Sequence, residues 1–349
     1  MTPRQRVYSA LEFRTPDRPP RNLWALPWVD IHAAKEKAEF LVEFPDDFTA
    51  PGEVLAPGDR RKGKRARLGI NVDDWGCIWE VAQDGVIGEV KYPPLKNLSM
   101  LPYYRPPWEI LQRANWDAVK IAQDRNLAGP EKFMLCGSSV RPFERMQFLC
   151  GSESLYLELG YGSIEVRKLR DLVHDFYMKE LAEWVKTGCD GISFMDDWGS
   201  QQSLLISPAM WRDFLKPLYR DYCDLIRRAG KKVFLHSDGC ILDIYEDLIE
   251  LGVSAVNSQL FCMDIEEIGR RCKGRITFWG EIDRQHILPF GTPEDCRSAV
   301  GRVRRALEDA RGGVIAECEW GVNAPIANIR AVFDEWSKPL ASVVGGEPG

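Results

Sequence analysis

The alternation of apolar and polar positions becomes regular from about residue 131 onward. Short apolar runs of strand length alternate with longer stretches in which apolar residues recur every three or four positions. The stretch 166–187 shows this period clearly, with Leu169, Leu172 and Val173 among its apolar positions, and Gly188 follows it as a helix terminator. The pattern therefore predicts alternating strands and helices over this part of the chain.

Seven strands can be placed by this pattern. The predicted strands are 23–26, 132–135, 191–195, 232–235, 255–257, 276–279 and 314–316. The predicted helices are 166–187, 208–229, 241–251, 264–272, 293–311 and 325–337. Strands that alternate with helices through short connections form a parallel sheet. With an eighth strand in the irregular region 40–130, the chain forms a (β/α)8 TIM barrel. A doubly wound open sheet is the alternative, although no GxGxxG segment follows a strand.

The first third of the chain has a different composition and a less regular pattern. Residues 1–130 are rich in Pro, Trp and turn-forming residues, and the alternating pieces 77–80 and 86–90 predict hairpin strands. We interpret 40–130 as an irregular, partly β insertion, either a lid or a dimer surface. It lies within a single barrel domain that spans 1–349.

Composition and charge limit the partners. The chain has 349 residues, 45% hydrophobic and 28% charged, an ordinary globular balance, and its net charge is −6. This charge disfavours nucleic acid as a partner. No apolar stretch has the character of a signal peptide or the length of a membrane span, so a cytoplasmic protein without a membrane partner is expected. The ten Cys are scattered, which is typical of buried thiols in a reducing compartment.

Chemically capable side chains collect directly after the predicted strands. They are Asp196, Asp197, Trp198 and Gln201 after 191–195, His236 and Asp238 after 232–235, Asn257 and Gln259 at the end of 255–257, Glu281 after 276–279, and Cys318 after 314–316. In a parallel barrel these strand ends lie at one rim, where barrel enzymes build their active sites. We therefore predict an active site there. The candidates for binding a small-molecule substrate are Asp196, Trp198, Gln201, Asn257 and Gln259.

His236 and Asp238 are candidate metal ligands. They are two positions apart on an extended strand end, so their side chains point the same way. Cys318 belongs to the same rim. Imidazole, thiolate and carboxylate are suitable ligands for Zn²⁺, which catalytic sites hold with three protein ligands and an open position. The spacing is too long to form a motif, so a neutral His that satisfies a buried loop and a buried Cys thiol are the structural alternatives.

Two carboxylates are candidates for proton transfer. One carboxylate of the pair Asp196-Asp197 is expected to face inward among hydrophobic neighbours such as Trp198, and Glu281 follows a strand rich in aromatic residues. Burial of such a carboxyl raises its pKa toward the range that suits proton transfer. A helix cap or a solvated loop is the alternative for Asp197. Glu317 and Glu319 are weaker candidates, because side chains alternate along a strand and these two face away from Cys318.

Several segments at these positions resemble the uroporphyrinogen decarboxylase superfamily, which includes zinc methyltransferases that move methyl groups between corrinoid proteins and thiols. The segments are RPFER at 141–145, DDWG at 196–199, Ser207-Pro208 with Trp211, HSDG at 236–239, GEID at 280–283, GTPE at 291–294, and Cys318 with Pro325 and Asn328. The resemblance runs over most of the chain from about residue 130 and implies a (β/α)8 barrel.

The methyltransferase branch holds zinc through a His-x-Cys-Gly segment at this strand end and a distant Cys. His236 and Cys318 match this pattern, and Asp238 stands where the middle Cys would be. The resemblance therefore implies a zinc-dependent methyltransferase with Zn²⁺ held by His236, Asp238 and Cys318. Asp197 and Glu281 would position the substrate or transfer protons. The resemblance also implies a corrinoid carried on a partner protein, and a homodimer is a further expectation.

Two alternative functions stay open. The decarboxylase branch uses arginines of an N-terminal segment for the substrate carboxylates, and the corresponding segment here, 23–30, contains no Arg. True uroporphyrinogen decarboxylation is therefore disfavoured. A metal-independent decarboxylase or lyase that uses Asp197 is the first alternative, and a non-catalytic binding barrel is the second.

Overall fold

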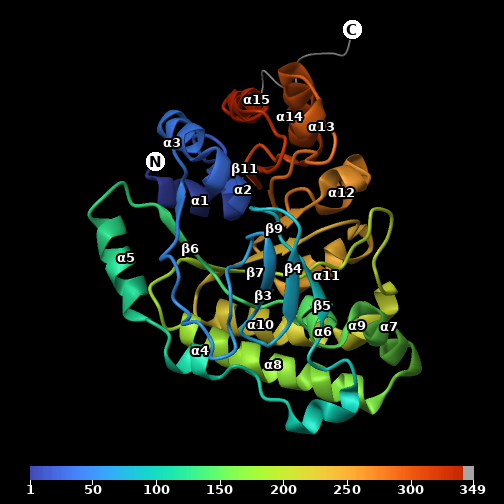
Figure 1. Cartoon of the computed structure of the whole chain (residues 1–349). Coiled ribbons are helices and arrows are strands. Elements are labelled where there is room, and N and C mark those ends of the chain that lie inside the picture. Colours follow the sequence, from blue (N-terminus) through green and yellow to red (C-terminus); the bar gives the residue numbers. More distant parts are fainter. Residues whose placement is uncertain (341–349) are drawn as a thin grey trace.

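Eight parallel strands form one sheet that curls into a nearly closed barrel in the computed structural model of the chain, which describes residues 1–340 (Figure 1). The strands are β1 (Arg21–Ala25), β2 (Phe48–Thr49), β6 (Phe133–Gly137), β7 (Gly191–Met195), β8 (Lys232–Ser237), β9 (Ala255–Ser258), β10 (Thr277–Trp279) and β11 (Val314–Trp320). Their order is β1-β11-β10-β9-β8-β7-β6-β2. The predicted TIM barrel is confirmed. The eighth strand, expected within 40–130, is β2, which has only two residues.

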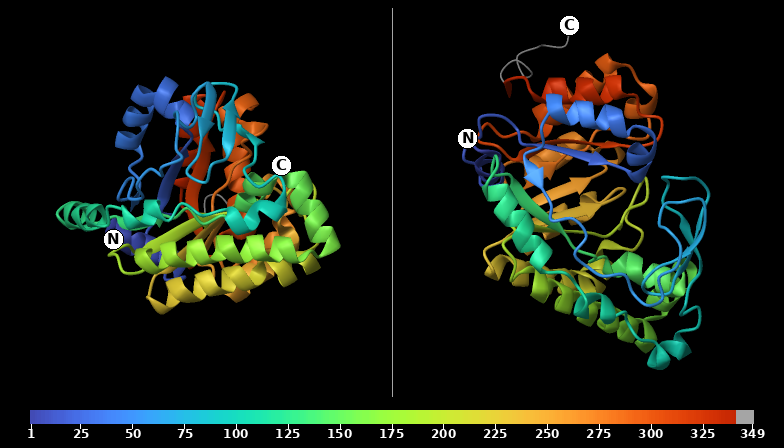
Figure 2. Two further views of the ribbon diagram at one scale, coloured as in Figure 1. Left: turned by 60° about the horizontal axis from the view of Figure 1, so that its bottom comes forward. Right: turned by 60° about the vertical axis from the view of Figure 1, so that its left-hand side comes forward.

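Helices connect the strands and cover the outside of the barrel (Figures 1 and 2). They are α1 (Pro3–Leu11), α2 (Pro27–His32), α3 (Ala34–Glu43), α4 (Glu109–Gln112), α5 (Asp117–Leu127), α6 (Pro142–Cys150), α7 (Ser152–Tyr161), α8 (Ile164–Trp184), α9 (Pro208–Phe214), α10 (Lys216–Arg228), α11 (Tyr245–Leu251), α12 (Ile265–Cys272), α13 (Ile287–Phe290), α14 (Pro293–Leu307) and α15 (Ile326–Trp336), with the 3₁₀ helices η1 (Leu98–Tyr103), η2 (Leu242–Ile244) and η3 (Leu260–Cys262). Within residues 1–340, none of them combines the length and the apolar character that a membrane span requires.

The predicted helix 208–229 is two helices in the structure. α9 ends at Phe214 and α10 begins at Lys216. Pro217 has no N–H to donate to the carbonyl four residues earlier, so the hydrogen-bond ladder is interrupted at this point. Proline also favours the first turn of a helix, which is where it stands in α10.

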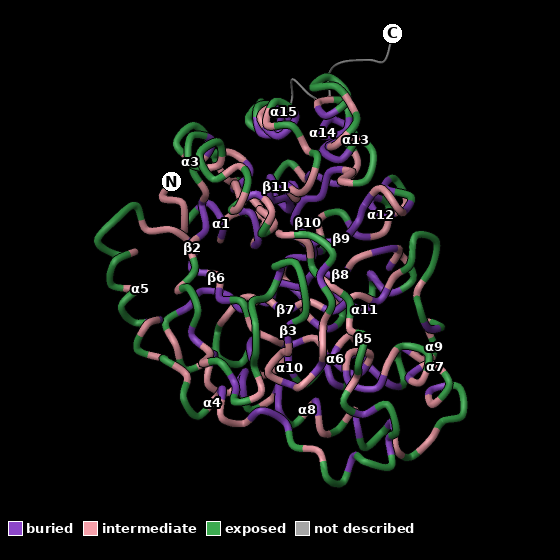
Figure 3. Tube along the Cα trace, in the orientation of Figure 1, coloured by how far each residue is buried: buried purple, intermediate pink, exposed green. Residues whose placement is uncertain are grey.

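Side chains of the strands alternate between the barrel interior and the layer beneath the helices. The interior cluster contains Val7, Leu11, Phe48, Phe133, Phe234, Ala255, Trp279 and Ile315. Neighbouring positions on the same strands, such as Leu235 and Ala316, belong to a second, larger cluster under the helices. The residues of both clusters are buried, and buried residues are purple in Figure 3. Each strand thus has one inward-facing set of positions. This alternation decides which polar side chains reach the barrel mouth.

The seam between β1 and β2 is held by two adjacent carboxylates. Asp47 N donates to Arg21 O at 2.9 Å. The Asp47 carboxylate accepts from Arg6 Nη1 at 2.6 Å and from Arg21 N at 2.7 Å. Asp46 accepts from Leu23 N at 2.8 Å. Because β2 is too short for a full ladder, these bonds bring the two edges of the sheet together.

Asp46 makes the stability of this seam depend on pH. Burial raises the pKa of Asp46 to about 6. The folded state therefore favours its neutral form, and the stability it contributes is present below about pH 4 and lost as the pH rises through about 6. We expect Asp46→Asn to be more stable than the unaltered protein by about 1 to 2 kcal/mol at neutral pH and equal to it near pH 4. Urea unfolding across this range measures the difference, and a difference that does not change with pH would contradict the assignment.

The region 40–130 contains a separate antiparallel sheet, which stands outside the barrel (Figure 2, right). Its strands are β3 (Gly69–Val72), β4 (Ile78–Val81) and β5 (Glu89–Tyr92), in that order. The predicted hairpin pieces 77–80 and 86–90 overlap β4 and β5. Trp79 packs on Phe148 of α6 with ring centroids 4.8 Å apart, which anchors the sheet beside the connection after β6. Its role as a lid or a dimer surface stays a prediction.

Candidate active site at the barrel mouth

His236 points into the barrel from the end of β8, two positions after the interior residue Phe234. His236 Nδ1 lies 2.6 Å from Asn257 Oδ1. Asn257 Nδ2 donates to Trp279 O at 2.6 Å and to Glu317 Oε2 at 3.1 Å. The amide oxygen of Asn257 is therefore the acceptor, and Nδ1 of His236 carries the proton. A neutral imidazole then presents the lone pair of Nε2 to the mouth.

Two carboxylates face that lone pair. Asp238 Oδ1 lies 3.4 Å and Asp197 Oδ1 3.6 Å from His236 Nε2. Ligand atoms of the three side chains lie within 4.8 Å of one another, and no other such group of three is found within residues 1–340. Asp238 Oδ1 is buried without a hydrogen-bond partner. Three electron-rich atoms that face one another need a shared cation, which is either a proton on Nε2 or a metal ion.

Arg284, in the connection after β10, joins this group to further acids. Its guanidinium lies 2.5 Å from Asp238, 2.7 Å from Glu319 and 3.3 Å from Glu281. One arginine therefore forms ion pairs with three carboxyl groups. The mouth keeps an excess of acidic groups, which is relieved either by protons or by a bound cation.

Glu281 and Glu317 are buried carboxyls. Burial raises the pKa of each well above the ordinary value. One oxygen of each, Glu281 Oε2 and Glu317 Oε1, has no hydrogen-bond partner. Burial also raises the pKa of Asp197. A carboxyl held neutral in this way can donate a proton at neutral pH, which is the role predicted for Glu281. The same role for Asp197 stays a prediction.

Cys318 lies on the face of β11 that is turned away from the mouth. Ile315 belongs to the interior cluster, and Glu317 and Glu319 follow on the same face. Cys318 is fully buried in the cluster under the helices. The expectation that Cys318 shares an ion with His236 is therefore corrected. Alternation along β11 brings the two glutamates to the mouth and takes the thiol away from it.

Asp196 and Trp198 belong to the wall of the barrel. Asp196 is fully buried and accepts hydrogen bonds from the backbone N–H groups of Phe143 and Glu144, both at 2.8 Å, at the start of α6. Trp198 Nε1 and the hydroxyl of Tyr219 also donate to it. The expectation that Asp196 and Trp198 bind substrate is corrected, because the carboxylate caps a helix and the indole donor is consumed within the fold.

The other predicted rim residues lie around the mouth in different roles. Asn257 orients His236, as described above. Gln259 Oε1 accepts from Gly239 N at 2.8 Å and holds the loop after β8. Gln201 is exposed and lines a small hollow together with Gln259 and Arg284. A contact of Gln201 or Gln259 with substrate stays a prediction.

One residue of the mouth, Arg284, escaped the sequence analysis. Arg284 follows the GEID segment directly, so a search for cations beside the predicted acids would have found it. Trp24 of β1 lies against the imidazole of His236, with ring centroids 5.0 Å apart, and is 5.4 Å from the ring of Trp279. The strand containing Trp24 was predictable, but the face that Trp24 occupies was not, because every residue of β1 is half-buried.

The fold and the ionisable side chains at its mouth define an enzyme built on a TIM barrel. Residues 83–338, more than half of the chain, match the family described as uroporphyrinogen decarboxylase (URO-D). The chain belongs to the URO-D family, and the resemblance seen in the sequence is confirmed. A search of the curated proteins finds no match.

A solved structure shares this fold over nearly the whole chain. A methyltransferase from Methanosarcina mazei has a TM-score of 0.71, with 16% sequence identity, and the match covers 96% of this chain and 98% of that chain. A 3-keto-D-glucoside 4-epimerase from E. coli (TM-score 0.40, 11% identity, 74% and 97% covered) and an endo-beta-1,4-xylanase from Gloeophyllum trabeum (TM-score 0.38, 12% identity, 63% and 81% covered) match less well.

Proposed function

We propose that the protein is a zinc-dependent methyltransferase of the URO-D superfamily. It moves a methyl group between a small-molecule substrate and a corrinoid carried on a partner protein, or a thiol acceptor. Asp197, His236 and Asp238 hold the Zn²⁺. Family membership and the fold shared with a methyltransferase support the reaction class. The observation that carries the metal is the lone pair of His236 Nε2 facing two carboxylates.

The donor set fits a divalent cation. An imidazole nitrogen and carboxylate oxygens are zinc ligands, and this set is harder than a thiolate site. Asp238 Oδ1 is buried without a partner, a state that is unfavourable unless a cation meets it. The hydrogen bond from His236 Nδ1 to Asn257 fixes the imidazole in the orientation that a ligand needs. When bound, zinc lowers the pKa of a thiol or hydroxyl group or polarises an ether oxygen.

The protein's own side chains prepare the mouth for transfer. Trp24 packs on the imidazole of His236 and keeps water from its inner face. Arg284 holds Asp238 through Oδ2, so that Oδ1 is left toward His236. Glu281, which burial keeps neutral, lies beside Arg284 and can give a proton to a departing oxygen.

Metal content and methyl transfer test this proposal. We expect about one zinc ion per chain after purification without chelator. We also expect the protein to accelerate transfer of the methyl group of methylcobalamin to a small thiol. The thiolate forms the sulfur–carbon bond, the cobalt–carbon bond breaks, and cobalt keeps the electron pair; the visible spectrum follows this change. Chelation should abolish the activity and zinc should restore it. A chain that binds no metal, even after incubation with zinc, would reject the proposal.

A metal-independent decarboxylase is a second candidate, favoured by one observation. Arg65 and Arg141 line a cavity beside the mouth, so arginines are present near the site although 23–30 has none. Arginines of this kind can hold substrate carboxylates. Asp197 would then handle the proton. Turnover of uroporphyrinogen that survives chelation and is lost in Asp197→Asn would favour this candidate over the methyltransferase.

A further inference from the structure

A cavity of about 420 Å³ lies beside the barrel mouth, between the three-stranded sheet and the start of α6. Aromatic and cationic side chains line it, among them Arg61, Arg65, Trp75, Trp79, Arg141 and Phe148. The cavity is distinct from the proposed metal group, since none of the three proposed ligands lines it.

The cavity presents hydrogen-bond donors that no protein acceptor meets. Within residues 1–340, the side chains of Arg61 and Arg65 make neither a hydrogen bond nor an ion pair. Asn71 Nδ2 and Trp79 Nε1 line the same cavity and are buried without partners. Asn71 is only 7% exposed. The two buried donors are costly to leave without acceptors, whereas Arg61 and Arg65 are exposed to solvent. Together the four side chains indicate a ligand that supplies acceptor oxygens.

The acidic side chains of the cavity do not cancel these donors. Asp73 pairs with Arg145 at 2.9 Å, so this arginine and this acid neutralise each other. Asp74 accepts from Gly58 N at 2.7 Å. Glu53 is the remaining acid of the lining and is exposed to solvent. The lining therefore holds the four arginines Arg61, Arg65, Arg141 and Arg145 against three acids, which is a small excess of positive charge.

Arg65 and Arg141 form the positive centre of the cavity. Burial, together with the neighbouring guanidiniums of Arg141, Arg145 and Arg61, lowers the pKa of Arg65, although part of its side chain is exposed to solvent at the edge of the cavity. The acid next to Arg141 is Glu144, 3.6 Å away. Burial raises the pKa of Glu144 to about 8, which favours its neutral form and weakens its pairing with Arg141. An anion bound between the arginines would relieve their mutual repulsion.

Arg141 also connects the cavity to the proposed metal group. Its Nη2 lies 2.7 Å from Met195 Sδ. Met195 is the cross-strand neighbour of His236 on β7 and β8. A molecule whose charged end meets Arg65 and Arg141 can therefore extend its other end toward the mouth.

We propose that this cavity binds the anionic end of the substrate, a carboxylate or a phosphate, while the flat apolar part of the molecule lies against Trp75 and Trp79. Arg65 and Arg141 supply the charge, and Asn71 and Trp79 donate hydrogen bonds. That the bound molecule is the substrate rests on the proposed function. The cavity can bind an aromatic anion even if the protein holds no metal and transfers no methyl group.

Binding of small aromatic anions to the whole protein, without added metal or methyl donor, tests this inference. The probes are benzoate, phenyl phosphate and neutral anisole, and tryptophan fluorescence and calorimetry give the Kd. We expect benzoate or phenyl phosphate to bind about tenfold more tightly than anisole, or more. The anion that binds more tightly identifies the charged group as a carboxylate or a phosphate. We expect Arg65→Gln to weaken it about tenfold, as the loss of one charged hydrogen bond predicts. Equal affinity for the anions and anisole, or an unchanged Kd in Arg65→Gln, would overturn the proposal.

Two variants separate this inference from the proposed function. Arg67→Gln is the matched control, because Arg67 belongs to the same segment but pairs with Asp84 at 3.3 Å outside the cavity. It should leave the Kd unchanged, and an equal weakening in Arg67→Gln would overturn the assignment to the cavity. His236→Ala should bind the anion as the unaltered protein does even when it has lost metal. Loss of anion binding in folded His236→Ala would overturn the independence of the cavity.

Discussion

His236→Ala is expected to lose the bound zinc, from about one ion per chain to about none, whereas Cys318→Ala is expected to retain it. The imidazole of His236 faces Asp197 and Asp238, and its removal leaves only carboxylates around the ion. The thiol of Cys318 lies on the other face of β11 and is fully buried. Elemental analysis of both purified variants measures the difference, and methyl transfer should follow the metal content.

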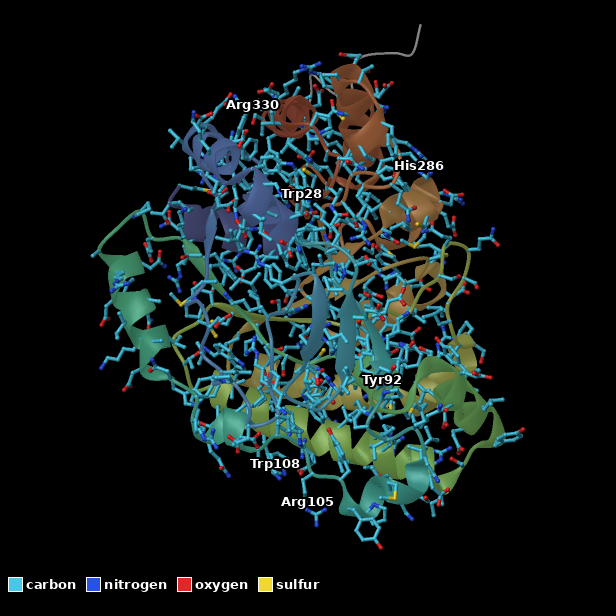
Figure 4. The ribbon with its side chains drawn as sticks, viewed as in Figure 1. Trp28, Tyr92, Arg105, Trp108, His286 and Arg330 are labelled. Carbon is cyan, nitrogen blue, oxygen red and sulfur yellow. The ribbon has the colours of Figure 1, made fainter. Side chains whose placement is uncertain are left out.

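His286→Ala is the control for the first of these variants. The His286 side chain is 79% exposed at the surface (Figure 4) and, among the described residues, pairs only with Asp283. Its zinc content should equal that of the unaltered protein.

Cys318→Ala leaves a small hole in the layer under the helices, so its unfolding free energy should fall by about 1 to 2 kcal/mol although the metal stays. Zinc lost from Cys318→Ala as well as from His236→Ala would restore the ligand set that the sequence indicates.

Asp196→Ala is expected to lower the stability and Asp197→Ala to abolish metal binding, although the two carboxylates are adjacent in the chain. The Asp196 carboxylate accepts hydrogen bonds from the start of α6 and from Tyr219. Its removal leaves several buried donors without an acceptor and should lower the unfolding free energy by about 3 to 5 kcal/mol. Asp197 accepts one backbone hydrogen bond, from Asp238 N. Its removal should change the stability by less than about 1 kcal/mol but abolish tight metal binding. Urea unfolding and zinc titration measure the two effects.

Asp196→Asn provides a milder comparison. The amide keeps one acceptor oxygen for the backbone of α6 but loses the charge, so the loss of stability should be smaller than in Asp196→Ala. Metal binding by the folded fraction should persist in both. If Asp196→Asn removes the metal while Asp197→Ala retains it, the assignment of the two carboxylates is reversed.

The barrel was predictable because its strands and helices are regular in sequence. Apolar runs such as 191–195 and 232–235 are bounded by turns, and the strands formed there are β7 and β8. The strand that closes the barrel was not locatable, because β2 has two residues and no periodicity can be read from two positions. Asp46 and Asp47 close the seam through contacts with β1 and α1, which are long-range and leave no local pattern.

The candidate site was predictable as a place but only partly as a set of residues. Strand ends carrying polar residues meet at one rim in any parallel barrel, so His236, Asp238 and Asp197 could be placed together. A strand end does not reveal which of two alternating faces looks inward. For this reason the sequence could not separate Cys318 from Glu317, or the capping Asp196 from the neighbouring site residue.

By itself, the sequence determined the class of fold, the family and the rim where ionisable side chains gather, because these follow from periodicity, from short motifs and from the direction of parallel strands. Only the tertiary structure decided the inward face of each strand, the proton on His236 Nδ1, the clamp of Arg284 and the cationic cavity under the three-stranded sheet. Those features depend on contacts between segments far apart in the chain. Because side chains alternate along a strand, a shift of one residue decides whether a side chain points into the mouth as a ligand or lies under the helices as a buried thiol.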